Sequence, residues 1–168
     1  MKKLLALAER GEGGEADNAR RILSRLLTTY GLTLEDLASD KRKRREFAYK
    51  LKDERFLFAM IVTNLFGSKS EIFQTATFNT KQKIIYVDLT DIEYIDLSNM
   101  WTFFRPLFNR ERDRLLSDAT SAFIMKHCLF DSDHESKESD EEIDWARMER
   151  ILELSRGMEN VTYRKQIK

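Results

Sequence analysis

Residues 91–130 read DIEYIDLSNMWTFFRPLFNRERDRLLSDATSAFIMKHCLF, and the pattern of this stretch decides the fold. Its apolar residues recur at steps of mostly three and four, which places them on one face of a helix. Burying each large apolar side chain contributes about 1.5–3 kcal/mol, so a face this wide has to cover another element. The face holds Ile92, Leu97, Trp101, Phe104, Phe108, Leu115, Ala119 and Ala122, widened by Met100, Phe103 and Leu107.

The stretch predicts one long helix from Asp91 to Phe130, whose aromatic residues we interpret as core. Thr90 is placed as the N-cap, and Glu93 completes a capping box. Pro106 lies in the middle of the pattern, and proline removes one backbone hydrogen bond from a helix. We therefore expect a kink there, or two helices that meet at Arg105.

Two segments before this helix favour β-structure and predict the surface that it covers. Glu71–Phe78 and Lys83–Leu89 are rich in residues typical of strands, and residues 79–82 supply a turn between them. A two-stranded hairpin alone is marginally stable in water, so one of its faces has to pack on helices. Asp53–Phe66 carries a helical pattern and precedes the hairpin.

The flanking segments complete an α+β, mostly helical chain. Residues 2–10 and 15–30 predict a helical hairpin around a glycine-rich turn, and Gly31 is placed to end the second helix. A polar, acidic linker leads to a last helix over about Glu141–Met158. We expect a helical hairpin module at 1–40, a core of helix, β-hairpin and long helix at 41–130, an acidic linker at 131–142, and a C-terminal helix with a basic tail at 143–168.

Three ordered segments near the N-terminus carry a family resemblance. Lys3–Ala8 (KLLALA), Glu15–Arg20 (EADNAR) and the leucine and Tyr-Gly-Leu positions of 26–32 resemble the domain of unknown function 2786, a short helical module of bacterial and phage proteins. The resemblance covers about the first quarter of the chain. It implies no catalytic residues, and by analogy it suggests a regulatory or counter-defence role of phage or mobile-element origin.

Charge and cysteine content limit the classes of function. The 29 basic and 29 acidic residues cancel, so the chain has no overall field that would hold nucleic acid or an anionic membrane. Cys128 is the single cysteine, which excludes an intramolecular disulfide. Charges at Glu9 and Arg10 interrupt the apolar N-terminal run before it reaches signal-peptide length, and no segment has the length of a membrane span. We expect a cytoplasmic protein.

The densest charge in the sequence is the basic run Lys41–Arg45. Adjacent cations release counterions when they meet a nucleic-acid backbone, so the run can be a phosphate-contacting patch. The alternative is a solvated linker or the exposed first turn of a helix. We favour this alternative because the net charge is zero. The nucleic-acid-binding candidates are Arg20, Arg21, Lys41, Arg42, Lys43, Arg44, Arg45 and Lys50.

Metal-ligand residue types gather only at 127–134. Their spacing matches no established zinc signature, and we favour a helix end followed by a solvated linker. The acidic residues at 91–96 are explained by a helix N-terminus, and no nucleophile or phosphate-loop motif occurs, so we predict neither catalytic residues nor a cofactor. The weak metal candidates are His127, Cys128, Asp131, Asp133 and His134.

These observations favour a non-catalytic binding or regulatory protein that occludes or bridges a macromolecular partner, more readily a protein than a nucleic acid. The apolar face of the last helix supplies the protein-binding candidates Trp145, Met148 and Leu152. Self-association is compatible with this hypothesis. Nucleic-acid binding through Lys41–Arg45 is the first alternative, and a metal-dependent enzyme is the second.

Overall fold

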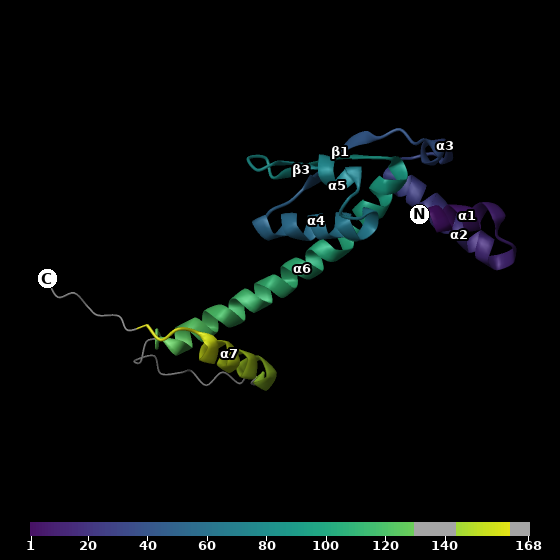
Figure 1. Cartoon of the computed structure of the whole chain (residues 1–168). Coiled ribbons are helices and arrows are strands. Elements are labelled where there is room, and N and C mark those ends of the chain that lie inside the picture. Colours follow the sequence, from purple (N-terminus) through teal and green to yellow (C-terminus); the bar gives the residue numbers. More distant parts are fainter. Residues whose placement is uncertain (130–143, 162–168) are drawn as a thin grey trace. The chain divides into compact units, whose positions relative to one another are not determined.

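The computed structural model describes residues 1–129 and 144–161, and the chain divides into two compact units, Met1–Pro106 and Leu107–Lys168 (Figure 1). The architecture is α+β and mostly helical, as the sequence predicts. The described helices are α1 (Lys2–Arg10), α2 (Gly13–Tyr30), α3 (Leu34–Ala38), α4 (Lys52–Phe66), α5 (Glu71–Thr75), α6 (Asp91–Lys126) and α7 (Trp145–Gly157), and the strands are β1 (Lys43–Ala48), β2 (Thr77–Asn79) and β3 (Ile84–Leu89).

The sheet of the first unit has three antiparallel strands in the order β1-β3-β2. The predicted strand Lys83–Leu89 is confirmed as the central strand β3. Phe47 of β1 and Phe78 of β2 both lie opposite Ile85 of β3. Alternate residues of β3 are buried, as the two-residue period of a strand requires, and they form one face of the core. The prediction of only two strands was wrong, since β1 adds a third.

The predicted strand Glu71–Phe78 was also wrong over most of its length. Its first part forms the short helix α5, and only Thr77 and Phe78 belong to β2. Ser70 begins α5, because its hydroxyl oxygen accepts a hydrogen bond from the Phe73 amide at 3.2 Å. Ile72 is buried from this turn. A local side-chain cap, together with one buried contact, overrides the β-favouring composition of the segment.

The basic run supplies the strand that the sequence did not predict. Lys43–Ala48 pairs with β3 over six residues, from Lys43 opposite Leu89 to Ala48 opposite Ile84. Phe47 is buried, while its neighbours Glu46 and Ala48 are exposed. The interpretation of this run as a linker or a helix turn was wrong. The period-two signal is hidden because the inward-facing positions before Phe47 carry cations instead of apolar residues.

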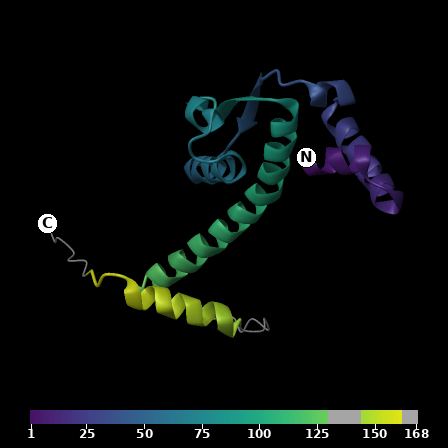
Figure 2. The same cartoon turned by 45° about the vertical axis from the view of Figure 1, so that its right-hand side comes forward.

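Two hydrophobic clusters form the interior of the first unit, and α6 contributes to both. Leu97 and Trp101 join the cluster between the sheet and α4, where the Trp101 and Phe58 rings meet edge to face at 5.3 Å. Ile95 joins the cluster beneath α1 and α2, where it packs with Leu23. The first turns of α6 therefore lie between the N-terminal helices and the α4–sheet layer (Figure 2).

The predicted apolar ridge covers the sheet only at its beginning. Leu97 and Trp101 are buried, whereas Phe103 is 63% exposed and Phe104 is 41% exposed. A helix of 36 residues is about 54 Å long at 1.5 Å per residue, and a six-residue strand is about 20 Å long, so the sheet is too short to cover the ridge. The core interpretation of Phe103 and Phe104 was wrong. One unbroken α6 passes through Pro106, so two helices do not meet at Arg105.

The predicted end of α2 and the predicted start of α6 are confirmed by their caps, whereas α6 ends at Lys126, before the predicted Phe130. The Thr90 amide donates to the Glu93 carboxylate at 2.9 Å, and the Glu93 amide donates to the Thr90 hydroxyl at 3.3 Å, which is a complete capping box. Gly31 follows α2 in the left-handed conformation at φ 62°. Local side-chain chemistry thus sets where α2 stops and where α6 starts.

The capping box of α6 gives the first testable prediction. Thr90→Ala removes the hydroxyl that accepts from the Glu93 amide, and we expect it to lower the free energy of unfolding by about 1 kcal/mol. Urea unfolding followed by circular dichroism measures the loss. Thr102→Ala, at an exposed position inside the same helix, is the matched control and should keep or slightly raise stability, because alanine is the better helix former. Equal losses in the two variants would show that the box does not stabilise α6.

Candidate protein-binding surfaces

The basic run holds a buried carboxylate at the start of α6. The side chain of Asp91 is fully buried, and its two oxygens accept from Lys43 Nζ at 2.8 Å and from Arg45. The Arg45 guanidinium also lies over the Tyr94 ring, 4.3 Å from its centroid. A buried charge is costly unless it is paired, so these contacts tie β1 to α6.

The other arginines of the run also contact their own fold. Arg42 Nη1 donates to Glu71 at 2.7 Å. The Arg44 guanidinium lies over the Tyr86 ring, 4.7 Å from its centroid. Cations that are paired in this way bind phosphates less readily than the freely solvated cations that the sequence suggested.

The side chains of the two arginines of α2 have local partners, whereas Lys41 and Lys50 are exposed and make backbone hydrogen bonds. On α2, Arg20 donates to the Ala8 carbonyl at 3.0 Å, and Arg21 donates to the Asn18 side chain at 3.1 Å. The backbone amide of Lys50 donates to the buried Glu54 at 2.6 Å. The structure therefore spreads the candidates over α2, β1 and the residues just before β1 and α4, and gives the arginines among them a structural contact.

Glu54 is a buried carboxylate that sequence reasoning missed. It also accepts from Arg105 Nε at 3.0 Å, and the Arg105 guanidinium lies over the Trp101 ring. The pair joins α4 to α6 just before Pro106. The only available signal was an acidic residue four positions before the buried Phe58, on the same helical face.

The weak metal candidates divide between described and undescribed parts of the chain. The His127 ring packs against the Phe123 ring at 4.4 Å, and Cys128 is exposed at φ 51°. Asp131, Asp133 and His134 lie outside the described residues. Within residues 1–129 and 144–161, no three His, Cys, Asp or Glu side chains come together in a group that could hold a metal ion.

In the second unit, one face of α7 packs on α6. Asp144 caps α7 by accepting from the Arg147 amide at 2.9 Å, and Ile151 is buried. Arg147 Nε and Arg150 Nε donate to the buried Asp118 of α6 at 2.9 and 3.3 Å. The hydrogen bond from Arg147, and then that from Arg150, holds the pKa of Asp118 below its usual value.

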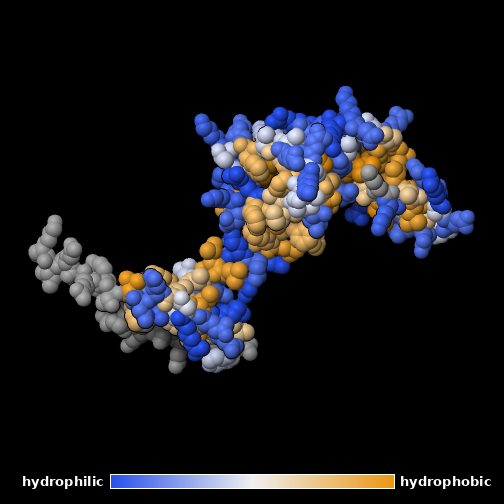
Figure 3. All heavy atoms as spheres, viewed as in Figure 1, coloured by the Kyte–Doolittle hydropathy of each residue, from blue (hydrophilic) through white to orange (hydrophobic). Residues whose placement is uncertain are grey.

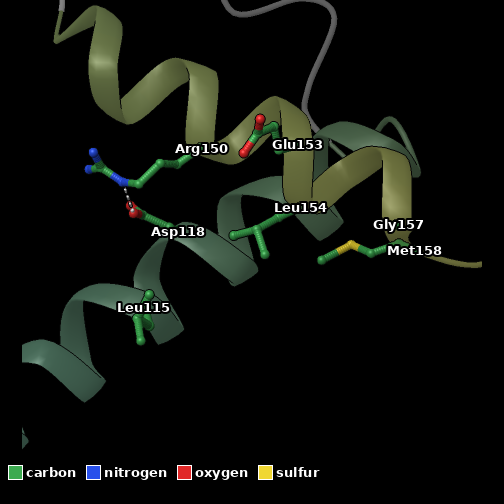
Figure 4. A pocket seen from close by; sticks show the side chains of 7 residues that line it. All are labelled: Leu115, Asp118, Arg150, Glu153, Leu154, Gly157 and Met158. Atoms are coloured by element: carbon green, nitrogen blue, oxygen red, sulfur yellow. Dashed lines mark hydrogen bonds and ion pairs between the residues drawn. The ribbon is translucent and has the colours of Figure 1, made fainter.

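A groove lies beside this ion pair (Figure 4). Its volume is about 510 Å³, and aliphatic side chains from both helices line much of it. Leu115 of α6, Leu154 of α7 and Met158, which follows α7, line it, with the Arg150–Asp118 pair at one end. The second unit thus leaves apolar surface open even along the contact between its two helices.

The opposite face of α7 carries the predicted protein-binding residues. Trp145 is 73% exposed, Met148 40% and Leu152 43%, and their spacing of three and four places them in one row. We call this row the α7 stripe. Glu149, Glu153 and Arg156 border it. The stripe lies away from the buried Ile151, so α7 is apolar on two faces.

The first unit exposes aromatic side chains that the site prediction did not include. The Phe103 and Phe104 rings stand edge to face at 5.1 Å, and both are exposed. On α4, Phe56 is 69% exposed and Met60 is exposed too, and Figure 3 shows apolar side chains gathered over this helix. Adjacent positions in a helix point about 100° apart, so Phe103 and Phe104 could not both follow Trp101 into the core.

Comparison with protein-family models finds no match to this chain, and comparison with curated proteins and with solved structures finds none either. The resemblance of the N-terminal segments to the domain of unknown function 2786 therefore stays a prediction. In the part of the chain that the structure describes, no helix combines the length and the apolar character needed to cross a membrane.

Asp91 gives a second testable prediction. Asp91→Ala leaves Lys43 and Arg45 without their shared carboxylate, and we expect it to lower the free energy of unfolding by about 3 kcal/mol. This value is at the low end for a broken buried ion pair, because both cations are partly exposed. Urea unfolding measures the change. Asp40→Ala, an exposed carboxylate between α3 and β1, is the control and should cost much less. Similar losses at the two positions would contradict a stabilising role for the buried cluster.

Asp118 gives a third prediction, on pH. Its folded-state pKa lies below the unfolded value of about 3.9, so the ion pairs stabilise the second unit fully above that value. This stabilisation is lost as the pH falls through the unfolded pKa and on through the folded one. We expect Asp118→Asn to be less stable than the wild type at neutral pH, and the difference to shrink below about pH 4. Urea titrations at several pH values measure it, and a difference that does not change with pH would refute this linkage.

Proposed function

We propose that this chain is a non-catalytic binding protein that occludes or bridges a protein partner. The observation that supports it most directly is the exposed ring pair Phe103–Phe104 on α6. Aromatic side chains are enriched at the centres of protein interfaces, where a few of them supply most of the binding energy. Two adjacent exposed rings on an anchored helix have the composition of such a centre.

The ring pair is held on a rigid part of the fold. Trp101, less than one turn before it, is buried in the core, and Arg105, directly after it, pairs with the buried Glu54. Residues on both sides of the pair are therefore fixed by tertiary contacts. A partner that packs on the rings loses little conformational freedom in this helix, which favours affinity.

The charge distribution favours a protein partner over a nucleic acid. The chain has no net charge, and the arginines of the basic run contact Glu71, Tyr86 and the buried Asp91. Nucleic-acid affinity comes mainly from cations that displace counterions at phosphates. Any nucleic-acid binding by this chain should then be weak, and its salt dependence is the quantity that tests the alternative.

A photo-crosslinking experiment tests the proposed surface and gives the fourth prediction. A photoreactive amino acid replaces Thr102, which is exposed beside the ring pair, in cells that produce the full chain. We expect covalent adducts with one protein, and we expect Phe103→Ser/Phe104→Ser to abolish them because the partner loses its main contact.

The control removes exposed apolar surface elsewhere in the same unit. Phe56→Ser/Met60→Ser changes two exposed residues of α4, and adducts at position 102 should persist in that variant. Circular dichroism establishes that both variants fold. Adducts that survive the loss of both rings, or that never form, would remove this surface from the proposal.

A further inference from the structure

In the described residues of the second unit, 107–129 and 144–161, two helical segments leave many apolar residues exposed. Its described part consists of the α6 segment from Leu107 and of α7, and the residues buried there are Asp118, Ala122 and Ile151. Helices that are apolar on more than one face normally occupy bundles of at least three or four helices. The exposed apolar residues include Leu115, Leu116 and Phe123 of α6 and Trp145, Met148 and Leu152 of α7.

Three apolar residues of α7 have the spacing of the core positions of one heptad. Trp145 and Leu152 are seven residues apart, with Met148 between them, so they occupy a, d and a positions of a heptad. Glu149 and Arg156 then both fall on e positions, on the same side of the stripe. Charged residues at such positions select the partner helix and its direction.

The charges are complementary to themselves when two copies of α7 meet antiparallel. A two-fold axis midway between Glu149 and Arg156 passes beside Leu152, and it places Glu149 of each copy opposite Arg156 of the other. In a parallel pair, e positions face g positions of the partner, so Glu149 would lie near Asp144 and Arg156 near Ile151, and neither would meet an opposite charge. The described residues of the second unit also contain seven basic and seven acidic residues, so two copies approach without net repulsion.

We propose that the α7 stripe packs antiparallel on the same stripe of a second copy of this chain. The dimer is isologous, because one surface contacts itself about a two-fold axis. Leu152 lies at the centre of the contact, and two Glu149–Arg156 pairs border it. This interface is separate from the Phe103–Phe104 surface of the first unit, and a dimer presents that surface twice, which is what bridging a partner requires.

The experiment is a charge-swap series in the full chain, with the molar mass measured by light scattering and sedimentation over a wide range of concentration. The wild type should form dimers. Glu149→Arg places like charges opposite each other at both borders of the contact, and Arg156→Glu does the same, so each single variant should lose the dimer. The double variant Glu149→Arg/Arg156→Glu restores opposite charges and should dimerise again.

Mixing the two single variants provides the decisive measurement. In a mixed pair, one copy is basic at both positions and the other is acidic at both, so two proteins that are monomeric alone should form a heterodimer together. Leu152→Glu, at the centre of the stripe, should abolish association in every combination, and circular dichroism checks that each variant keeps its helices. A monomeric wild type would overturn the proposal, and so would a dimer that the single swaps leave intact or single variants that do not associate on mixing.

Discussion

A fully buried carboxylate, Asp91, fixes how the first unit is assembled. It lies in the first turn of α6 and accepts from Lys43 and Arg45 of β1, so it joins the edge of the sheet to the start of the long helix. Such a charge is tolerated only when its partners stay in place. The same turns direct Leu97 and Trp101 toward the sheet and Ile95 toward the N-terminal helices. Both hydrophobic clusters therefore depend on one ion-paired junction.

The length of α6 follows from its local sequence. The exposure of its middle part follows from the small size of the sheet that packs on it. The capping box at Thr90 starts the helix, and helix-forming residues continue it to Lys126. The sheet beneath it is a few residues long, so only the first turns are covered. Phe103 and Phe104 are exposed where α6 extends past the sheet, between the buried Trp101 and the Arg105–Glu54 pair. Surplus apolar surface on a rigid helix is typical of a protein that binds other proteins.

The division of charge between the interior and the surface bears on both proposals. The basic run, which stands out in the sequence, is largely occupied in holding β1 to its neighbours. The second unit uses Asp118 with Arg147 and Arg150 in the same way, on the face of α7 that packs on α6. Glu149 and Arg156 border the other face, where they are available to a second copy. In both proposals, recognition depends mainly on apolar rows, and charge sets direction and partner choice.

Local sequence determined α1, α2, α4, α6, α7 and the central strand β3, because hydrophobic period and hydrogen-bonding side chains act within a few residues. The segment of α5 was predicted as a strand and is the exception. It also identified Trp145, Met148 and Leu152 as one apolar row of the last helix. Only the tertiary structure decided that Lys43 and Arg45 pair with a carboxylate nearly fifty residues away, and this made a strand of a segment that resembles a linker. It also decided which part of the α6 ridge is buried. Both outcomes depend on which distant segments pack together and on how long those segments are. A periodic pattern in one segment carries no information about the length or the charge of the segment that packs against it.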